Sequence, residues 1–226
     1  KGTSEAGLYG DFVQEIDARV GQILQVVKQN DIDKQTLIIF TADNGGAPEY
    51  WFFKKYKHFM NIDRRGKKAE IWEGGVRVPF IARWKGVIKP GTRSDKPISL
   101  VDMLATFSNV VNQSFDQNYA EDSYDVSNIL LGEGTQKSRG AMINQTGNPN
   151  ALSITKDGWK LIPYGHGNSG LEQPEQGESE GMLFNLNKDP MEHHNLYAEN
   201  PKKVKELLKL LEQYKRSGFS RSRSDE

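Results

Sequence analysis

The stretch TLIIFTADNGG, Thr36–Gly46, decides the fold of this 226-residue chain. An apolar, partly β-branched run stops abruptly at Asp43 and Asn44, and two glycines follow at once. A continuous apolar run of this kind predicts a strand buried on both faces, over Thr36–Thr41. In open α/β sheets, ligands bind beyond the carboxyl ends of the strands, and Asp43 and Asn44 fall at such an end.

The residues that end this strand have two interpretations. The carboxylate of Asp43 and the side-chain carbonyl of Asn44 are hard oxygen donors, which suit Ca²⁺ or Mg²⁺. Gly45 and Gly46 would let the backbone turn sharply and let a ligand approach. Asp, Asn and Gly are also the commonest turn residues. Taken alone, the stretch favours a simple turn after a strand.

The surrounding pattern predicts an α/β fold. Apolar residues recur at helical spacing over Asp11–Gln29 and again over Ser99–Val111, which indicates two amphipathic helices. Val76–Trp84 is predicted to form a second core strand. A helix followed by a buried strand is the repeating half of an α/β sheet.

The pattern changes in the last third of the chain. Short apolar pieces separated by Gly, Asn and Asp predict a small antiparallel sheet, over Ala141–Asn144, Ala151–Thr155, Trp159–Pro163 and Met182–Leu186. The composition of Gly165–Gly181 predicts a mobile surface loop. Asn200 and Pro201 offer an N-cap and first position for a closing helix, and a disordered tail is expected after it. We therefore divide the chain into residues 1–112, a connector over 113–137, and a C-terminal subdomain over 138–226.

Composition excludes several classes of function. Lys plus Arg and Asp plus Glu both number 30, so net charge gives no argument for a nucleic-acid partner. No apolar run is long enough to predict a membrane span. The chain has no cysteine, which excludes disulfides, thiolate metal sites and a cysteine nucleophile within these residues.

A long basic and aromatic segment links the two predicted strands. Ala47–Glu73 shows no clean period, and a loop of this length inside a compact domain is usually functional. Its aromatic part could contact a sugar or aryl group by stacking and cation–π contacts, or it could pack as a lid, through Trp51, Phe52, Phe53, Lys55, Tyr56 and His58. Its basic end, Arg64–Lys68, would suit a multiply charged oxyanion, although a solvated basic loop is an equal alternative.

Together, TLIIFTADNGG, the basic RxxK and WEGGVRVPFIARW resemble the second half of the sulfatase family, within the alkaline-phosphatase-like superfamily. YGDFVQEIDARVG, KPISLVDMLATF and LFNLNKDPMEHHNL agree in the same order along the chain. The resemblance implies part of an alkaline-phosphatase-like sandwich, a mixed sheet with flanking helices, joined to the small C-terminal antiparallel sheet and its closing helix.

The resemblance also implies roles for individual residues. Asp43 and Asn44 occupy positions of two Ca²⁺ ligands, and Lys68 occupies the position of a lysine that contacts the substrate sulfate. Arg65 receives no catalytic role. Glu73, with the two glycines after it, is expected to shape the loop rather than to touch substrate.

The family's nucleophile is a formylglycine made from Cys or Ser in a C/S-x-P-x-R motif, and this chain contains no such motif. We therefore expect the chain to be the C-terminal portion of a longer sulfatase that acts on a sulfated carbohydrate or aryl sulfate. Formylglycine would belong to the other portion, and the Ca²⁺ site would be incomplete here, so we expect no activity from this chain alone.

Two other functions stay open at this point. One is a phosphoryl or phosphonate hydrolase of the same superfamily. The other is a non-catalytic scaffold that binds a sulfated glycan or a partner chain. The adjacent His193 and His194 do not face the same way, so we do not expect them to form a metal site. Trp72, Trp84 and Trp159 are expected in the core or between the subdomains rather than in a binding platform.

Overall fold

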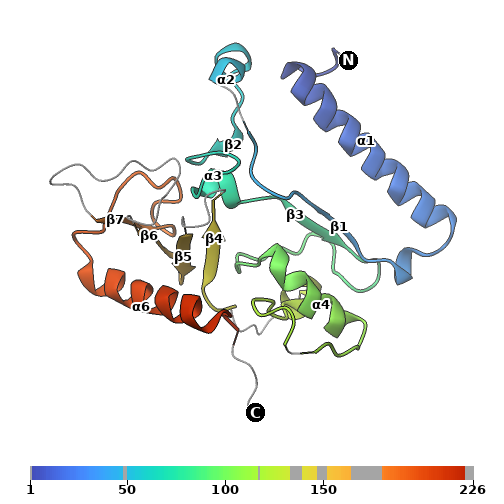
Figure 1. The fold of residues 1–226 in the computed structure, drawn as a ribbon. Helices are drawn as coiled ribbons and strands as arrows, with labels where there is room; N and C mark the ends of the chain where they lie inside the picture. The colour runs from blue at the N-terminus through green and yellow to red at the C-terminus, as the bar shows by residue number, and fades with distance from the viewer. Residues whose placement is uncertain are drawn as a thin grey trace.

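The computed structural model describes residues 2–47, 50–116, 118–132, 139–146, 152–163 and 180–221. The elements follow one another along the chain as shown in Figure 1: α1 (Gly7–Gln29), η1 (Asp33–Gln35), β1 (Ile38–Thr41), α2 (Tyr50–Tyr56), β2 (Met60–Asp63), α3 (Glu73–Val76), β3 (Phe80–Arg83), η2 (Leu100–Asp102), α4 (Met103–Val110), α5 (Ser127–Leu131), β4 (Met142–Gln145), β5 (Leu152–Lys156), β6 (Trp159–Pro163), β7 (Gly181–Asn185) and α6 (Pro201–Ser217).

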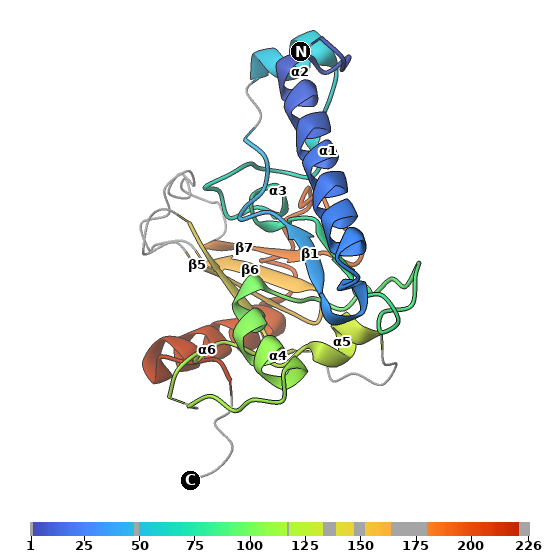
Figure 2. The same cartoon turned by 90° about the vertical axis from the view of Figure 1, so that its right-hand side faces the viewer.

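The first part of the chain builds a small α/β unit. β1 pairs antiparallel with β3, with Ile38 opposite Arg83 and Thr41 opposite Phe80. The helix α1 lies beside this ribbon (Figure 2). Asp33, just before β1, accepts a 2.7 Å hydrogen bond from Arg83 and so locks the register. The predicted helix and strands are therefore present.

The prediction that the first strand is buried on both faces is wrong for the part of the chain that the structure describes. Phe40 of β1 and Ile81 of β3 are exposed, and β3 is the strand paired with β1. A continuous apolar run indicates that both faces of a strand are covered, but it does not show which polypeptide covers them. The second strand is also shorter than predicted: β3 begins only at Phe80, and Val76 belongs to the helical turn α3. Likewise, Ala47–Glu73 is no continuous loop, since it contains α2 and β2.

The predicted helix over Ser99–Val111 begins as the 3-10 turn η2 and continues as α4. A capping box starts it: the Asp102 carboxylate accepts the backbone N–H of Ser99 at 2.7 Å. Asp102 also accepts the N–H of Tyr124 at 3.1 Å and lies 3.5 Å from the Arg139 guanidinium. Burial raises the pKa of Asp102, against the opposing charge of Arg139. The apolar face predicted for this helix is present but exposed at Leu104, among other residues.

The C-terminal part is an antiparallel sheet of order β4-β5-β6-β7, as the sequence predicts. The helix α6 covers one face and buries a core with it, made of Ala141, Ile154, Leu161, Leu183, Val204, Leu207 and Leu211. The opposite face packs against the segment before α3, through Ile71, Trp72, Ile162, Met182, Phe184 and Leu186. The sheet is therefore sandwiched between α6 and the α/β unit, and Trp72 lies in the core between them, as expected.

The chain after α6 differs from the disordered tail that we expect. The N–H of Ser220 donates to the Asp122 side chain at 2.8 Å, and the Tyr124 hydroxyl donates to the Ser220 carbonyl at 2.6 Å. These contacts fix the chain as far as Arg221, because they satisfy backbone groups that a free tail would expose to water. Residues 222–226 and nearly all of the predicted mobile loop Gly165–Gly181, with His166, lie outside the described residues.

Asn200 stands at the N-cap position of α6, but its side chain does not cap the helix. It donates instead to the carbonyl of Leu196 at 3.2 Å. Pro201 occupies the first turn as predicted. The start of α6 is therefore set by proline rather than by the expected asparagine cap.

Candidate functional site

The end of β1 is held in direct backbone contact with α3. The N–H of Gly45 donates to the carbonyl of Gly75 at 2.9 Å. A Cβ atom at position 45 would lie 1.8 Å from the Gly74 carbonyl oxygen, so no side chain fits there. The two glycine pairs of the sequence, after Asn44 and after Glu73, therefore meet because only bare backbones can approach this closely.

The basic segment returns to the same place. The N–H of Lys68 donates to the carbonyl of Gly46 at 3.0 Å. The side chain of Asn61 closes the gap, because it accepts the Gly46 N–H at 2.7 Å and donates to the carbonyls of Gly46 and Gly66, each at 3.1 Å. The segment between Gly46 and Lys68 is thus an arm whose two ends are tied together beside Asp43 and Asn44.

The three residues predicted for the site are therefore gathered around one backbone junction. Asp43 is exposed, and one of its carboxylate oxygens accepts the N–H of Asn44 at 3.0 Å. The amide nitrogen of Asn44 donates to the carbonyl of Gly45 at 2.9 Å, so a metal ion at this side chain would have to bind through Oδ1. The side chain of Lys68 is exposed.

This donor set fits part of a calcium site. Asp43 and Asn44 offer hard oxygen atoms, whereas Ca²⁺ takes about six to eight. Within the described ranges, no group of three or more His, Cys, Asp or Glu side chains is placed to hold a metal ion. His193 and His194 are exposed, and the nearest carboxylate to His194 is Asp189 at 3.6 Å. The described carboxylates therefore do not complete a calcium site by themselves.

Arg65, which precedes Lys68 in the basic segment, is used for packing. Its guanidinium carbon stacks 3.5 Å from the centre of the Trp72 ring, and its Nη1 donates to the carbonyl of Glu192 at 3.3 Å. A cation–π contact on a buried tryptophan, together with this hydrogen bond, fixes the direction of the arginine side chain.

The sequence did not predict a buried ion cluster formed by Lys160, Glu73 and Glu192. Lys160 of β6 is completely buried, and its Nζ lies 3.1 Å from Glu73 and 2.8 Å from Glu192. The other oxygen of Glu73 pairs with Arg77. The one local sign of this cluster in the sequence is a lysine within an apolar strand. Its partners lie far along the chain, and Glu73 is 87 residues away.

The two carboxylates of this cluster differ in their electrostatics. Burial alone would raise the pKa of Glu73, but Lys160 and Arg77 outweigh it and hold that pKa below its usual value. Burial raises the pKa of Glu192, because it outweighs the lowering by Lys160 and by the hydrogen bond from the Glu73 N–H, and the like charge of the Glu73 carboxylate adds to the rise. Glu73 is therefore the firmer anion of the pair.

The arm from Gly46 to Lys68 carries the aromatic residues singled out above. Phe52 of α2 is buried, with its ring centre 5.6 Å from Tyr9 of α1 and 4.9 Å from Tyr56. Trp51 next to it is 61% exposed. The arm is thus packed on α1 through Phe52, as a lid would be, while the neighbouring indole of Trp51 is exposed.

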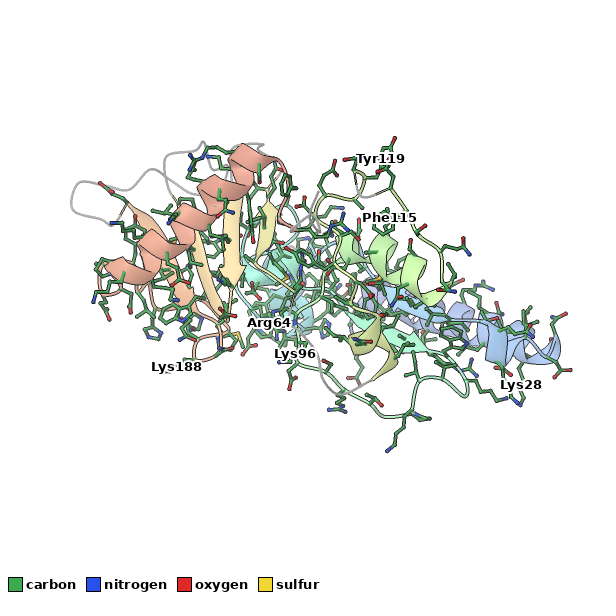
Figure 3. All side chains as sticks on the ribbon, turned by 90° about the horizontal axis from the view of Figure 1, so that it is seen from below. Lys28, Arg64, Lys96, Phe115, Tyr119 and Lys188 are labelled. Carbon is green, nitrogen blue, oxygen red and sulfur yellow. The ribbon has the colours of Figure 1, made fainter. Side chains whose placement is uncertain are left out.

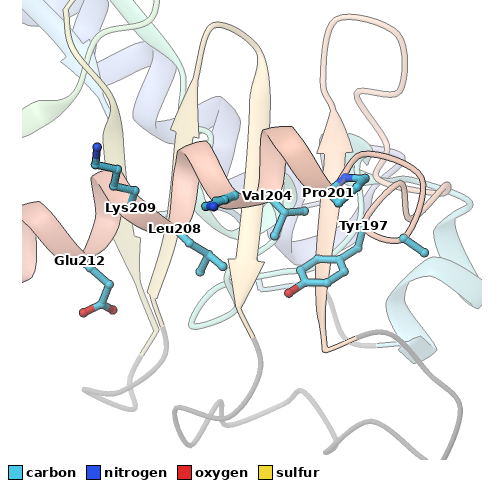
Figure 4. A pocket seen from close by; sticks show the side chains of 8 residues that line it. Tyr197, Pro201, Val204, Leu208, Lys209 and Glu212 are labelled. Carbon is cyan, nitrogen blue, oxygen red and sulfur yellow. The ribbon is translucent and has the colours of Figure 1, made fainter.

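A separate groove of about 480 Å³ runs along α6, lined by Tyr197, Ala198, Pro201, Val204, Lys205, Leu208, Lys209 and Glu212 (Figure 4). It shares no residue with the junction at Gly45, and its apolar lining provides no paired catalytic groups. We therefore place the candidate site at the end of β1 rather than in this groove.

A sulfatase family model matches residues 2–113, which hold the end of β1, the arm and α3. The chain belongs to the sulfatase family. It is 31% identical to N-acetylgalactosamine-6-O-sulfatase of Bacteroides thetaiotaomicron, over 95% of this chain and 43% of that protein. It is also 31% identical to human arylsulfatase A, over 93% of this chain and 43% of that protein.

The fold agrees with this assignment. A solved structure from work on glycosaminoglycan metabolism by Bacteroides thetaiotaomicron matches with a TM-score of 0.83 and 30% identity, covering 95% of this chain and 46% of that one. The chain thus spans less than half the length of these relatives. The family resemblance and the mixed α/β fold with small antiparallel sheets are confirmed. The site residues and the domain boundaries stay predictions.

The described helices include none that is both long and apolar enough to cross a membrane.

Proposed function

We propose that this chain is part of a sulfuric-ester hydrolase that acts on a sulfated carbohydrate. In this proposal Asp43 and Asn44 hold Ca²⁺, and Lys68 contacts the sulfate group. The observation that carries it is the hydrogen bond from the Lys68 N–H to the Gly46 carbonyl, which ties the lysine to the metal-ligand stretch.

The chemistry of these residues suits sulfate-ester cleavage. Bound calcium would act as a Lewis acid on the sulfuryl oxygens. The ammonium group of Lys68 would hold a sulfate oxygen and offset the negative charge that grows on the leaving oxygen. The backbone contact of Gly45 with Gly75 would keep Asn44 in place, so little reorganisation is needed during the reaction.

A carbohydrate is the proposed substrate class for two reasons. One relative is named for a sulfated amino sugar, and the matching solved structure comes from work on glycosaminoglycans. In addition, the exposed indole of Trp51 lies on the arm rooted at the site, with Lys55 on the same helix. An aromatic face with nearby cations suits a ring that carries sulfate groups.

The exposed apolar side chains support the proposal that this chain packs against further polypeptide. Phe12 of α1, Ile81 of β3 and Val111 after α4 are each more than 60% exposed. Covering these side chains with further polypeptide would remove apolar surface from water, which is favourable. With less than half of the relatives' length matched and no C/S-x-P-x-R motif in the sequence, we propose that this chain alone does not hydrolyse sulfate esters.

The test uses a hybrid enzyme, in which residues 1–226 follow the part of N-acetylgalactosamine-6-O-sulfatase that precedes its matched segment. The hybrid should release sulfate from a sulfated N-acetylgalactosamine or an aryl sulfate, while residues 1–226 alone should not. Faster turnover of an aryl phosphate would favour the phosphoryl hydrolase instead. A folded hybrid that binds sulfated glycan without turnover would favour the scaffold.

A further inference from the structure

We propose that Lys160 and Glu192, in the C-terminal subdomain, are positioning residues that hold the Lys68 segment and the end of β1 in their working arrangement. This inference rests on the proposed function, since it concerns the same site. Among the described contacts, neither residue touches the candidate metal ligands or the side chain of Lys68, so they act through the backbone that carries them.

Glu192 contacts both ends of the segment that bears Lys68. Its carbonyl accepts the Arg65 guanidinium at 3.3 Å, and its carboxylate accepts the N–H of Glu73 at 2.7 Å. The residue itself has a φ of 58°, a left-handed conformation that costs free energy for a side chain other than glycine. The turn after β7 therefore allows Glu192 to contact both Arg65 and Glu73, the two ends of this segment.

Lys160 of β6 holds the same contacts in place. Its Nζ joins Glu73 to Glu192, and all three side chains are buried. A buried ion pair seldom stabilises more than well-packed apolar residues of the same volume, and the rest of β6 is apolar. A buried lysine here is thus better explained by the orientation that it imposes on two carboxylates than by stability.

The arrangement continues from Glu73 to the site through short backbone links. Gly74 donates its N–H to the Arg65 carbonyl at 2.7 Å, and the Gly75 carbonyl accepts the N–H of Gly45 at 2.9 Å. Only the short Gly74-Gly75 step thus separates the ion cluster from the end of β1. If Glu73 shifts, both the turn with Arg65 and the contact with Gly45 have to shift.

The first test measures amide hydrogen exchange in residues 1–226 and needs no enzyme activity. Lys160→Met should speed exchange at the amides of Gly45, Lys68 and Gly74 by about tenfold or more, while amides inside α6 stay protected. Glu192→Gln, which keeps the acceptor and the volume, should give a smaller effect at the same amides.

The control is another buried ion pair, Asp102 with Arg139, which lies 3.5 Å apart and has no described contact with the α3 segment. Asp102→Asn should destabilise its own surroundings and leave the Gly45 and Lys68 amides unchanged. Equal acceleration at all protected amides in Lys160→Met and Glu192→Gln would show a merely structural role and overturn the proposal. So would unchanged exchange at the site.

The second test uses the hybrid enzyme and compares variants at matched folded fractions. Glu192→Gln should lower kcat severalfold with little change in KM, because the substrate still binds but Lys68 is less well held. A parent-like kcat would contradict the positioning role. An inactive parent hybrid would count against the proposed function alone, since the exchange result does not depend on turnover.

Discussion

Replacing Gly45 by alanine probes the backbone junction on which the site depends. The added Cβ would lie 1.8 Å from the Gly74 oxygen and 2.8 Å from the Gly74 carbonyl carbon, so α3 and the end of β1 have to separate. Overpacking of this kind costs about 1–3 kcal/mol. Loss of the hydrogen bond from Gly45 to Gly75 adds about 0.5–1.5 kcal/mol. We expect Gly45→Ala to lower the free energy of unfolding by about 2–4 kcal/mol.

The matched control is Gly21→Ala. Gly21 lies in the middle of α1 and is exposed, and beyond its chain neighbours and its own helix backbone no atom lies within 4 Å of the position that its Cβ would take, so alanine meets no obstacle there. The same substitution should then stabilise the chain by about 0.5–1 kcal/mol, because alanine favours the helix. Urea unfolding followed by tryptophan fluorescence measures both variants. Equal stabilities for Gly45→Ala and the parent chain would refute the close contact described here.

Two further predictions concern Asp11 near the start of α1 and Trp51 in the arm. Backbone N–H groups of Gly2, Ser4 and Thr3 hold the pKa of Asp11 far below its usual range. The contribution of the Asp11 carboxylate to folding stability is therefore complete above the usual aspartate pKa of about 3.9, and it is lost only as pH falls well below that value. An NMR titration should therefore show the Gly2 amide released only in strong acid, and Asp11→Asn should release it at every pH. Trp51→Ala in the hybrid should raise KM for a sulfated oligosaccharide roughly two- to tenfold and leave a small aryl sulfate unaffected; equal effects on both substrates would contradict stacking on a sugar.

The elements that could be predicted from sequence are those with a repeating pattern of their own. The spacing of Val204, Leu207 and Leu211 predicts α6, and each of these residues is buried. The prediction failed for Phe40, because a continuous apolar run indicates that both faces of a strand are covered without showing what covers them. The cluster around Lys160 could not be predicted at all, since its partners lie far along the chain and Glu192 carries no local signal for its left-handed turn.

The candidate site shows a mixed outcome. Local chemistry favoured a simple turn after β1, and the Asn44 amide does make a turn contact with Gly45. The association of this stretch with Lys68 came from resemblance to a family, and the structure brings the two backbones together. Spacing alone could not have predicted this, because the arm between them is long and its ends meet through the Lys68–Gly46 hydrogen bond and the side chain of Asn61.

The proposal that Lys68 contacts the sulfate group is tested by the rate of sulfate release from the hybrid enzyme carrying Lys68→Ala. Lys68 binds Gly46 through its backbone N–H, so alanine keeps that hydrogen bond and removes only the ammonium group. Lys28, at the far end of α1 from the basic segment (Figure 3), supplies the control Lys28→Ala. We predict that Lys68→Ala lowers kcat/KM by about 100-fold or more while Lys28→Ala leaves it unchanged. A Lys68→Ala hybrid as active as the parent hybrid would contradict it.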